Sequence, residues 1–151
     1  MHMQETPAFC LECGAHAMRV CTDPIPVELR EGTYYVGGFE HGHCDACGED
    51  YVWANDVDPI QCAAVSMARD DLGRLDSAAI HELRHALGLT QADLERQLGV
   101  STGTVGRWER GEVLQSRMAD NFMRVLWDHP ELIAESGVVA REKRGPYRKR
   151  T

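Results

Sequence analysis

Two pairs of cysteines have the spacing CxxC, Cys10 with Cys13 and Cys44 with Cys47. A CxxC pair places two thiolates on one tight turn, close enough to share a metal ion. Two such pairs supply the four sulfur ligands that a tetrahedral Zn²⁺ accepts, at about 2.3 Å for each bond. A glycine follows the second cysteine of each pair, where a positive φ lets backbone amides turn toward the sulfurs. The sequence therefore predicts one structural zinc ion per chain, held by these four cysteines.

Other interpretations of the cysteines stay open. The two pairs are separated by 30 residues, more than the roughly 15–20 of common zinc ribbons, so the segment between them must build a hairpin or small sheet. A redox couple or two pairs without metal would use the same residues, although a redox CxxC opens a helix in a βαβ unit. The residues that could replace a cysteine as ligand are His16, Cys21, His41, His43 and Cys62. Four thiolates leave no open coordination position, which argues against catalysis at the metal.

Length and composition indicate a globular chain of one ordinary domain or two small ones. It has 151 residues, of which 43% are hydrophobic and 26% are charged. No apolar run is long enough to span a bilayer, and the start lacks the basic and apolar segments of a signal peptide. We therefore expect a cytoplasmic protein with no membrane partner, whose cysteines stay reduced and available to metal.

Charge divides the chain into three parts. Residues 1–75 hold four basic and 13 acidic groups, residues 76–139 hold six and ten, and residues 140–151 hold six and one. The three parts carry −9, −4 and +5, which gives the net charge of −8. This acidic total argues against a protein that coats polyanions in general, while local basic groups can still contact phosphate on one face. Sequence-specific DNA binding is therefore compatible with the charge.

The residue pattern predicts an α+β fold with a zinc domain, a linker and an all-α domain. Residues 1–56 contain turn residues and short β-type runs around Val27, Thr33–Val36 and Tyr51–Ala54, which suit a small β-rich domain around the zinc. Residues 57–75 are expected to form a helical linker that starts near Pro59. Short helices are expected over residues 76–137, followed by a basic tail over residues 138–151.

Five short helices are expected in residues 76–137. Asp76 or Ser77 can cap the first, which carries an apolar face and stops at Gly88. Thr90 can cap the second, with Asp93 three residues on in the arrangement of a capping box. Gly residues after the apolar runs provide the stop signals.

The remaining three helices follow from cap residues and apolar spacing. Ser101 caps the third, which turns Val105 and Trp108 inward and ends at Gly111. The fourth spans residues 116–128, and the fifth starts at Pro130. The residues of the fourth helix expected in the core are Met118, Phe122, Val125 and Leu126.

The stretch GLTQADLERQLGVSTGTVGRWERGE contains a tight Leu98-Gly99-Val100 junction between the second and third helices. In a helix-turn-helix motif, the second helix of such a pair enters the major groove. The stretch resembles the core of the phage-repressor/Cro (XRE) helix-turn-helix family, including the GLTQ opening. The residues for which this resemblance implies DNA contacts are Gln91, Ser101, Thr102, Gly103, Thr104, Arg107 and Arg110. A helical bundle without a DNA role is the alternative.

The whole arrangement resembles the MqsA family of antitoxins. The shared features are the two CxxC pairs, a linker, the helix-turn-helix and an HPEL segment from His129 to Leu132. The resemblance implies an amino-terminal zinc domain that binds a ribonuclease toxin. It also implies a carboxy-terminal domain that forms a homodimer and represses its own operon.

The resemblance assigns roles to single residues. Gln91 matches a glutamine that fastens its helix to the DNA backbone, and Arg107 matches a base-reading arginine. A bidentate bond from such an arginine to guanine contributes about 1–3 kcal/mol of discrimination. Gly103 stands where these antitoxins have a base-reading asparagine, so the operator must differ or the neighbouring threonines must take over. Arg84 and Glu109 match a buried ion pair that ties the first helix to the third.

These observations predict a sequence-specific transcriptional repressor that binds an operator in double-stranded DNA and acts as an autoregulating antitoxin. A stand-alone zinc-containing regulator or adaptor without a toxin partner is the alternative, and a zinc or thiol-redox sensor that uses Cys21 or Cys62 is a third. No catalytic triad, phosphate loop or carboxylate pair stands out in the sequence, so we expect no enzymatic activity. The basic tail is either a DNA-contacting arm or a solubilising end.

Overall fold

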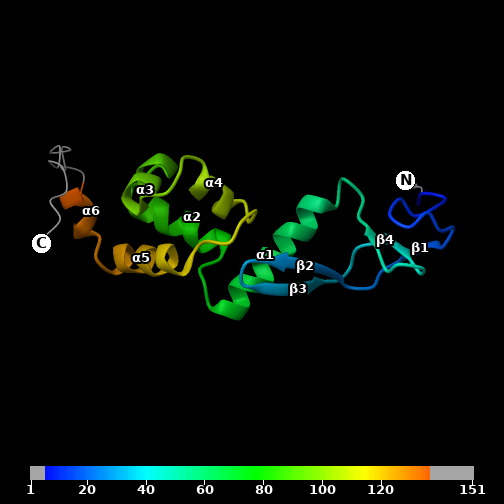
Figure 1. Ribbon diagram of the computed structural model, residues 1–151. Coiled ribbons are helices and arrows are strands. Elements are labelled where there is room, and N and C mark those ends of the chain that lie inside the picture. Colours follow the sequence, from blue (N-terminus) through cyan, green and yellow to red (C-terminus); the bar gives the residue numbers. More distant parts are fainter. Residues whose placement is uncertain (1–5, 137–151) are drawn as a thin grey trace, which may run out of the picture. The chain divides into compact units, whose positions relative to one another are not determined.

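The computed structural model describes residues 6–136 of the chain (Figure 1). Within this range the protein is a mixture of helices and small sheets, with five strands followed by six helices. The described residues divide into two compact units, residues 6–76 with 110–114 and residues 77–109 with 115–136. The basic tail expected over residues 138–151 lies outside the described residues. No helix within the described range combines the length and the apolar character that crossing a membrane requires.

The first unit begins with a small antiparallel sheet of three strands in the order β1-β4-β5. The strands are β1 (Met18–Cys21), β4 (His41–Cys44) and β5 (Asp50–Tyr51). Along the β1–β4 ladder, Cys21 pairs with His41 at one end and Met18 pairs with Cys44 at the other. This register puts a metal-ligand candidate, Cys44, at the end of the central strand.

A hairpin and a long helix form the rest of the first unit. The strands β2 (Ile25–Leu29) and β3 (Gly32–Val36) pair antiparallel, and α1 (Val57–Leu72) packs against both of them (Figure 1). The buried centre of this packing consists of Ile25, Val36, Ile60 and Ala64. Residues 57–75, which the sequence suggests as a linker, therefore contribute a helix to the core of the first unit.

The second unit is helical throughout its described residues. Its helices are α2 (Ser77–Ala86), α3 (Gln91–Leu98), α4 (Thr104–Glu109), α5 (Arg117–Asp128) and α6 (Glu131–Ser136). α2 and α3 each pack against α4 and α5. The buried apolar side chains of this unit are Ile80, Leu83, Leu94, Val105, Trp108, Ala119, Met123 and Leu126.

The caps of α3 and α5 show how the sequence sets helix boundaries. The Thr90 hydroxyl accepts a hydrogen bond from the Asp93 amide at 3.1 Å, and the Thr90 amide donates to the Asp93 carboxylate at 3.0 Å. This reciprocal pair is the predicted capping box, which is confirmed. Gly99 ends α3 in the left-handed conformation with a φ of 69°. Ser116 caps α5 by accepting from the Ala119 amide at 3.1 Å.

The start of α4 differs from the expectation that Ser101 caps a helix from residue 102. Gly103 has a φ of +85°, which a right-handed helix cannot contain, so α4 begins only at Thr104. The cap comes from elsewhere in the unit, because the buried Glu95 carboxylate on α3 accepts from the Val105 amide at 3.1 Å. Ser101 instead accepts from the Thr104 amide through its backbone carbonyl.

The sequence-based expectation for the buried face of α5 was partly wrong. Leu126 is buried as expected, but the other three residues are exposed, with Met118 at 82%, Phe122 at 38% and Val125 at 42%. The helix carries two parallel apolar stripes, and the buried one runs through Ala119, Met123 and Leu126. Apolar spacing alone shows that each stripe lies on one face of a helix, and does not show which stripe meets the core.

Candidate metal centre and candidate nucleic-acid interface

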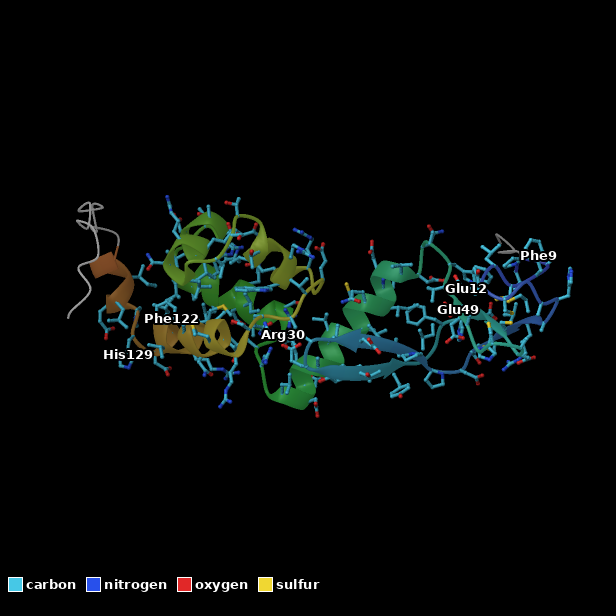
Figure 2. All side chains as sticks on the ribbon, viewed as in Figure 1. Phe9, Glu12, Arg30, Glu49, Phe122 and His129 are labelled. Atoms are coloured by element: carbon cyan, nitrogen blue, oxygen red, sulfur yellow. The ribbon has the colours of Figure 1, made fainter. Side chains whose placement is uncertain are left out.

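The four predicted cysteine ligands come together in the first unit. Figure 2 labels Glu12 and Glu49 in the same part of the chain, with sulfur atoms in yellow beside them. The Sγ atoms of Cys10, Cys13, Cys44 and Cys47 all lie within 4.8 Å of one another. The distances between the pairs are 3.7 Å from Cys10 to Cys47 and 3.7 Å from Cys13 to Cys44. Around a tetrahedral ion with metal–sulfur bonds of about 2.3 Å, neighbouring sulfurs are about 3.8 Å apart. The prediction that these four residues are positioned to bind a metal ion is confirmed.

Two turns of the same form position the sulfurs. The Gly14 amide donates to the Cys10 carbonyl at 2.8 Å, and the Gly48 amide donates to the Cys44 carbonyl at the same distance. Both glycines have the positive φ that the sequence predicted, 74° for Gly14 and 80° for Gly48. In the second turn, backbone hydrogen bonds from Cys47 and then Ala46 lower the pKa of the Cys44 thiol to about 7. These amides therefore stabilise the thiolate, which is the form that binds a metal.

The Cys47 thiol has the opposite shift. A backbone hydrogen bond from Glu49 lowers its pKa, but burial and the thiols of Cys10, Cys13 and Cys44 together outweigh this and raise the pKa to about 12. Four sulfurs at such short distances repel each other once they are ionised, so the full set of thiolates favours a bound cation. Four soft sulfur ligands in a tetrahedral arrangement suit zinc or an iron–sulfur centre.

The alternative ligands are engaged in other contacts. The His16 ring lies 3.1 Å from the Ala8 carbonyl through Nδ1. The His43 Nδ1 atom lies 2.7 Å from Asp50, and the His41 Nε2 atom lies 3.3 Å from the Cys21 sulfur. Within residues 6–136, the four CxxC cysteines are the one group of three or more His, Cys, Asp or Glu side chains that could hold a metal ion together.

In the second unit, several of the predicted DNA contacts surround one open hollow of about 850 Å³. It lies between the end of α2, the start of α3 and the residues before α4, and its lining includes Gln91, Thr102 and Gly103. Ser101 and Arg107 are also exposed, and Thr104 is half-buried. The start of α3 and the residues just before α4 therefore lie at the same exposed surface.

Arg110 has a different environment from the other predicted DNA contacts. It belongs to the first unit rather than the second. Its guanidinium donates to the Glu112 carboxylate, with a distance of 2.6 Å from Nε to Oε1. A contact from Arg110 to phosphate would have to compete with this exposed ion pair.

A buried carboxylate holds the helices around the hollow together. Glu109, the last residue of α4, accepts from Arg84 of α2 at 2.6 and 3.1 Å and from the amide nitrogen of Gln91 at 2.8 Å. The side chains of Arg84 and Glu109 are 10% and 7% exposed, so the predicted buried ion pair is confirmed. Burial would raise the pKa of Glu109, but the hydrogen bonds from Arg84, Gln91 and His81 outweigh it and lower the pKa to about 2.

Sequence reasoning missed two contributions to this surface. Glu95 fixes the start of α4 from a buried position, but a glutamate in a short helix carries no local signal of burial. Gln91 was expected at the DNA backbone, and its amide nitrogen is directed to Glu109 in the structure. The side-chain oxygen of Gln91 is a separate group, so this bond fixes the orientation of the side chain at the rim of the hollow.

Comparison with known proteins gives one family. The sequence profile of the family described as the antitoxin component of a bacterial toxin-antitoxin system, MqsA, matches residues 8–136. The match extends over the cysteine cluster and all six helices. No curated protein matches the chain.

Proposed function

The chain belongs to the MqsA family of antitoxin components, and from this membership we propose that it is a zinc-bound antitoxin that represses transcription by binding an operator. The DNA-binding part of this proposal depends on one observation. Gln91, Thr102 and Gly103 line the same hollow beside α4. α3 and α4, with the turn between them, form a helix-turn-helix of the XRE type. The role of the protein is binding rather than catalysis.

In this proposal α4 is the recognition helix. The first residues of a recognition helix approach the base edges, while the helix before it lies across the DNA backbone. Thr102 and Gly103 precede α4, and the exposed Arg107 lies on its outer face one turn further on. The Glu109 carboxylate holds α2, α3 and α4 in fixed positions. The recognition surface is therefore organised before DNA binds, which reduces the cost of ordering it.

The exposed stripe of α5 supports a homodimer. Met118, Phe122 and Val125 line a shallow groove of about 580 Å³ together with Arg117 and Asn121. Apolar side chains at spacings of four and three residues form one continuous face of a helix, and such exposed faces mark interaction surfaces. A twofold pair of chains would cover this face and place two α4 helices on two half-sites of an operator.

The first unit is proposed to hold zinc and to bind the toxin. Zinc accepts four thiolates in the tetrahedral geometry that the Sγ distances allow, and it would supply a structural crosslink without redox chemistry. The toxin is proposed to be a ribonuclease, whose RNA-binding surface must carry positive charge. Residues 1–75 carry a net charge of −9, which complements such a surface.

The test of DNA binding uses the DNA upstream of the gene and a matched pair of arginine variants. Arg107→Ala should remove discrimination between operator and random DNA, a loss of about 1–3 kcal/mol for one bidentate base contact. Arg96→Ala is the control, because Arg96 is exposed on α3 and forms an ion pair with Asp93. Binding is measured by fluorescence anisotropy at fixed salt. If Arg107→Ala leaves the footprint and the ratio of operator to random-DNA affinity unchanged, residues other than Arg107 read the bases.

A further inference from the structure

A second group of reactive side chains lies in the same sheet as the metal cluster. Cys21 ends β1, His41 begins β4 and Asp50 begins β5, so three neighbouring strands contribute one residue each. The antiparallel register pairs Cys21 directly with His41. None of the three belongs to the cluster of four cysteines.

The hydrogen bonds of His41 direct its basic nitrogen toward the thiol. The Nδ1 atom lies 3.3 Å from the Phe39 carbonyl, which can only accept, so Nδ1 carries the proton in this bond. The Nε2 atom, 3.3 Å from the Cys21 sulfur, then presents its lone pair to the S–H group. His41 is 1% exposed, so the protein sets this tautomer rather than solvent.

A carboxylate lies beside the same nitrogen. The Oδ1 atom of Asp50 is 3.4 Å from His41 Nε2 and 2.7 Å from His43 Nδ1. When His41 holds the thiol proton on Nε2, this carboxylate oxygen can accept a hydrogen bond from that nitrogen. A thiol, a base within hydrogen-bond reach and a carboxylate that supports the base are the parts of an activated nucleophile.

We propose that Cys21 is a modification site, a thiol that His41 activates for oxidation by a hydroperoxide. The thiol proton passes to His41 Nε2, and the sulfur attacks one oxygen of the peroxide. The S–O bond forms as the O–O bond breaks, and the imidazolium returns the proton to the leaving hydroxide. Hydrogen peroxide and the thiol thus give a sulfenic acid and one water. Cys21 is half-buried, which admits a small neutral peroxide to the sulfur.

A second metal site would use the same residue types. The sulfur and the carboxylate each lie near His41 Nε2, but within residues 6–136 only the four CxxC cysteines form a group of three or more side chains that could hold a metal ion together. The geometry therefore favours a thiol–imidazole pair over a preformed metal site. The two are distinguished by experiment.

The test is the rate of sulfenic-acid formation at each cysteine of the full chain with its metal bound, with hydrogen peroxide, a sulfenic-acid trap and mass spectrometry. Cys62 is the control inside the same molecule, since it is also half-buried but donates only to the Arg110 carbonyl, at 3.8 Å. Burial raises the pKa of the Cys62 thiol. Cys21 should react at least about tenfold faster than Cys62, because positioned bases contribute that much or more. Equal rates at the two cysteines would overturn the proposal.

Variants separate activation by His41 from simple exposure of the sulfur. His41→Gln should reduce the rate at Cys21 to that of Cys62, in protein shown to keep its metal content and circular dichroism. Where His41→Gln loses the metal, Asp50→Asn serves instead, with an expected fall of several-fold. An unchanged rate at Cys21 in the folded variant contradicts the proposal. Protection of Cys21 by a second equivalent of zinc, absent in Cys21→Ser, would replace it with a metal site.

Discussion

The three-stranded sheet of the first unit and the helices of the second unit bury very different side chains. In the β1-β4-β5 sheet, the buried residues of the central strand are His41, Gly42 and Cys44. The second unit buries Trp108, Met123 and Leu126 among other large apolar residues. Burial of a large apolar side chain contributes about 1.5–3 kcal/mol, and the small sheet has almost none of this stabilisation. The comparison teaches that the three-stranded sheet lacks a hydrophobic core for which a metal at the four cysteines can substitute, while packing is sufficient in the second unit.

The largest effect should follow from removing one ligand of the cluster. Cys44→Ser should lose the metal and unfold the three-stranded sheet, because metal binding supplies the folding free energy of such a site. The helices of the second unit should stay folded. Metal content per chain and residue-resolved hydrogen exchange measure the two effects.

The matched control for this variant is Cys62→Ser, which changes a free cysteine on α1 outside the cluster. It should keep one metal per chain and the protection of β1 and β4. Retention of a full equivalent of metal by Cys44→Ser would show that the four sulfurs are not the ligand set, and the contrast between the two units would fail.

The second-largest effect should be a loss of stability in the second unit alone. Glu109→Ala leaves Arg84 buried without its partner, and breaking a buried pair in this way costs up to about 3–5 kcal/mol. The metal content should not change. Glu112→Ala is the control, because Glu112 pairs with Arg110 near the surface and such pairs contribute about 0–1 kcal/mol. Chemical unfolding of both variants gives the difference, and equal stabilities would show that the Glu109 network does not hold α2 to α4.

The dependence of stability on pH tests the same contribution of Glu109 to the second unit. The pKa of Glu109 is lowered from 4.5 in the unfolded reference to about 2 in the folded protein. A carboxylate with a lowered folded pKa stabilises the protein fully above its unfolded pKa, and this stabilisation is lost as pH falls. The second unit should therefore lose stability between about pH 4.5 and 2. Unfolding of Glu109→Ala should show a smaller pH dependence in this window.

The smallest change in stability should come from the exposed stripe of α5. Phe122→Glu should turn the proposed dimer into a monomer with little loss of monomer stability, because Phe122 is already 38% exposed. Figure 2 labels this side chain on α5. Met123→Ala on the same helix should instead cost about 2–5 kcal/mol, since Met123 is fully buried. Sedimentation and thermal unfolding separate the two. A dimer that survives Phe122→Glu would move the interface away from α5.

Much of the candidate site was predictable because its signals are local. A CxxC turn followed by glycine fixes the ligand pairs within five residues, and Gly14 and Gly48 have the positive φ expected. The capping box of Thr90 and Asp93 depends on a spacing of three residues and was also correct. Such features need only the backbone geometry of one turn, which the sequence specifies directly.

Features that depend on packing between elements were harder to predict. Gly103 shortens α4, and Glu95 caps it from another helix, although nothing near Glu95 in the sequence indicates burial. The inner face of α5 was placed on the stripe of Met118 and Phe122, whereas the structure buries Ala119 and Met123. Two apolar stripes on one helix have equal periodicity, and only the shape of the opposing surface selects between them.

The sequence by itself determined the four cysteines of the metal site, the capping box of α3 and the partner of Arg84, because ligand spacing and turn chemistry act over short distances or follow a family pattern. The tertiary structure decided the environment of Cys21, which looked like an unpaired thiol and lies beside His41 and Asp50. It also decided that α1 belongs to a core rather than to a linker. Strand register and helix packing bring together residues far apart in the chain, and their proximity is a property of the folded molecule that no local pattern contains.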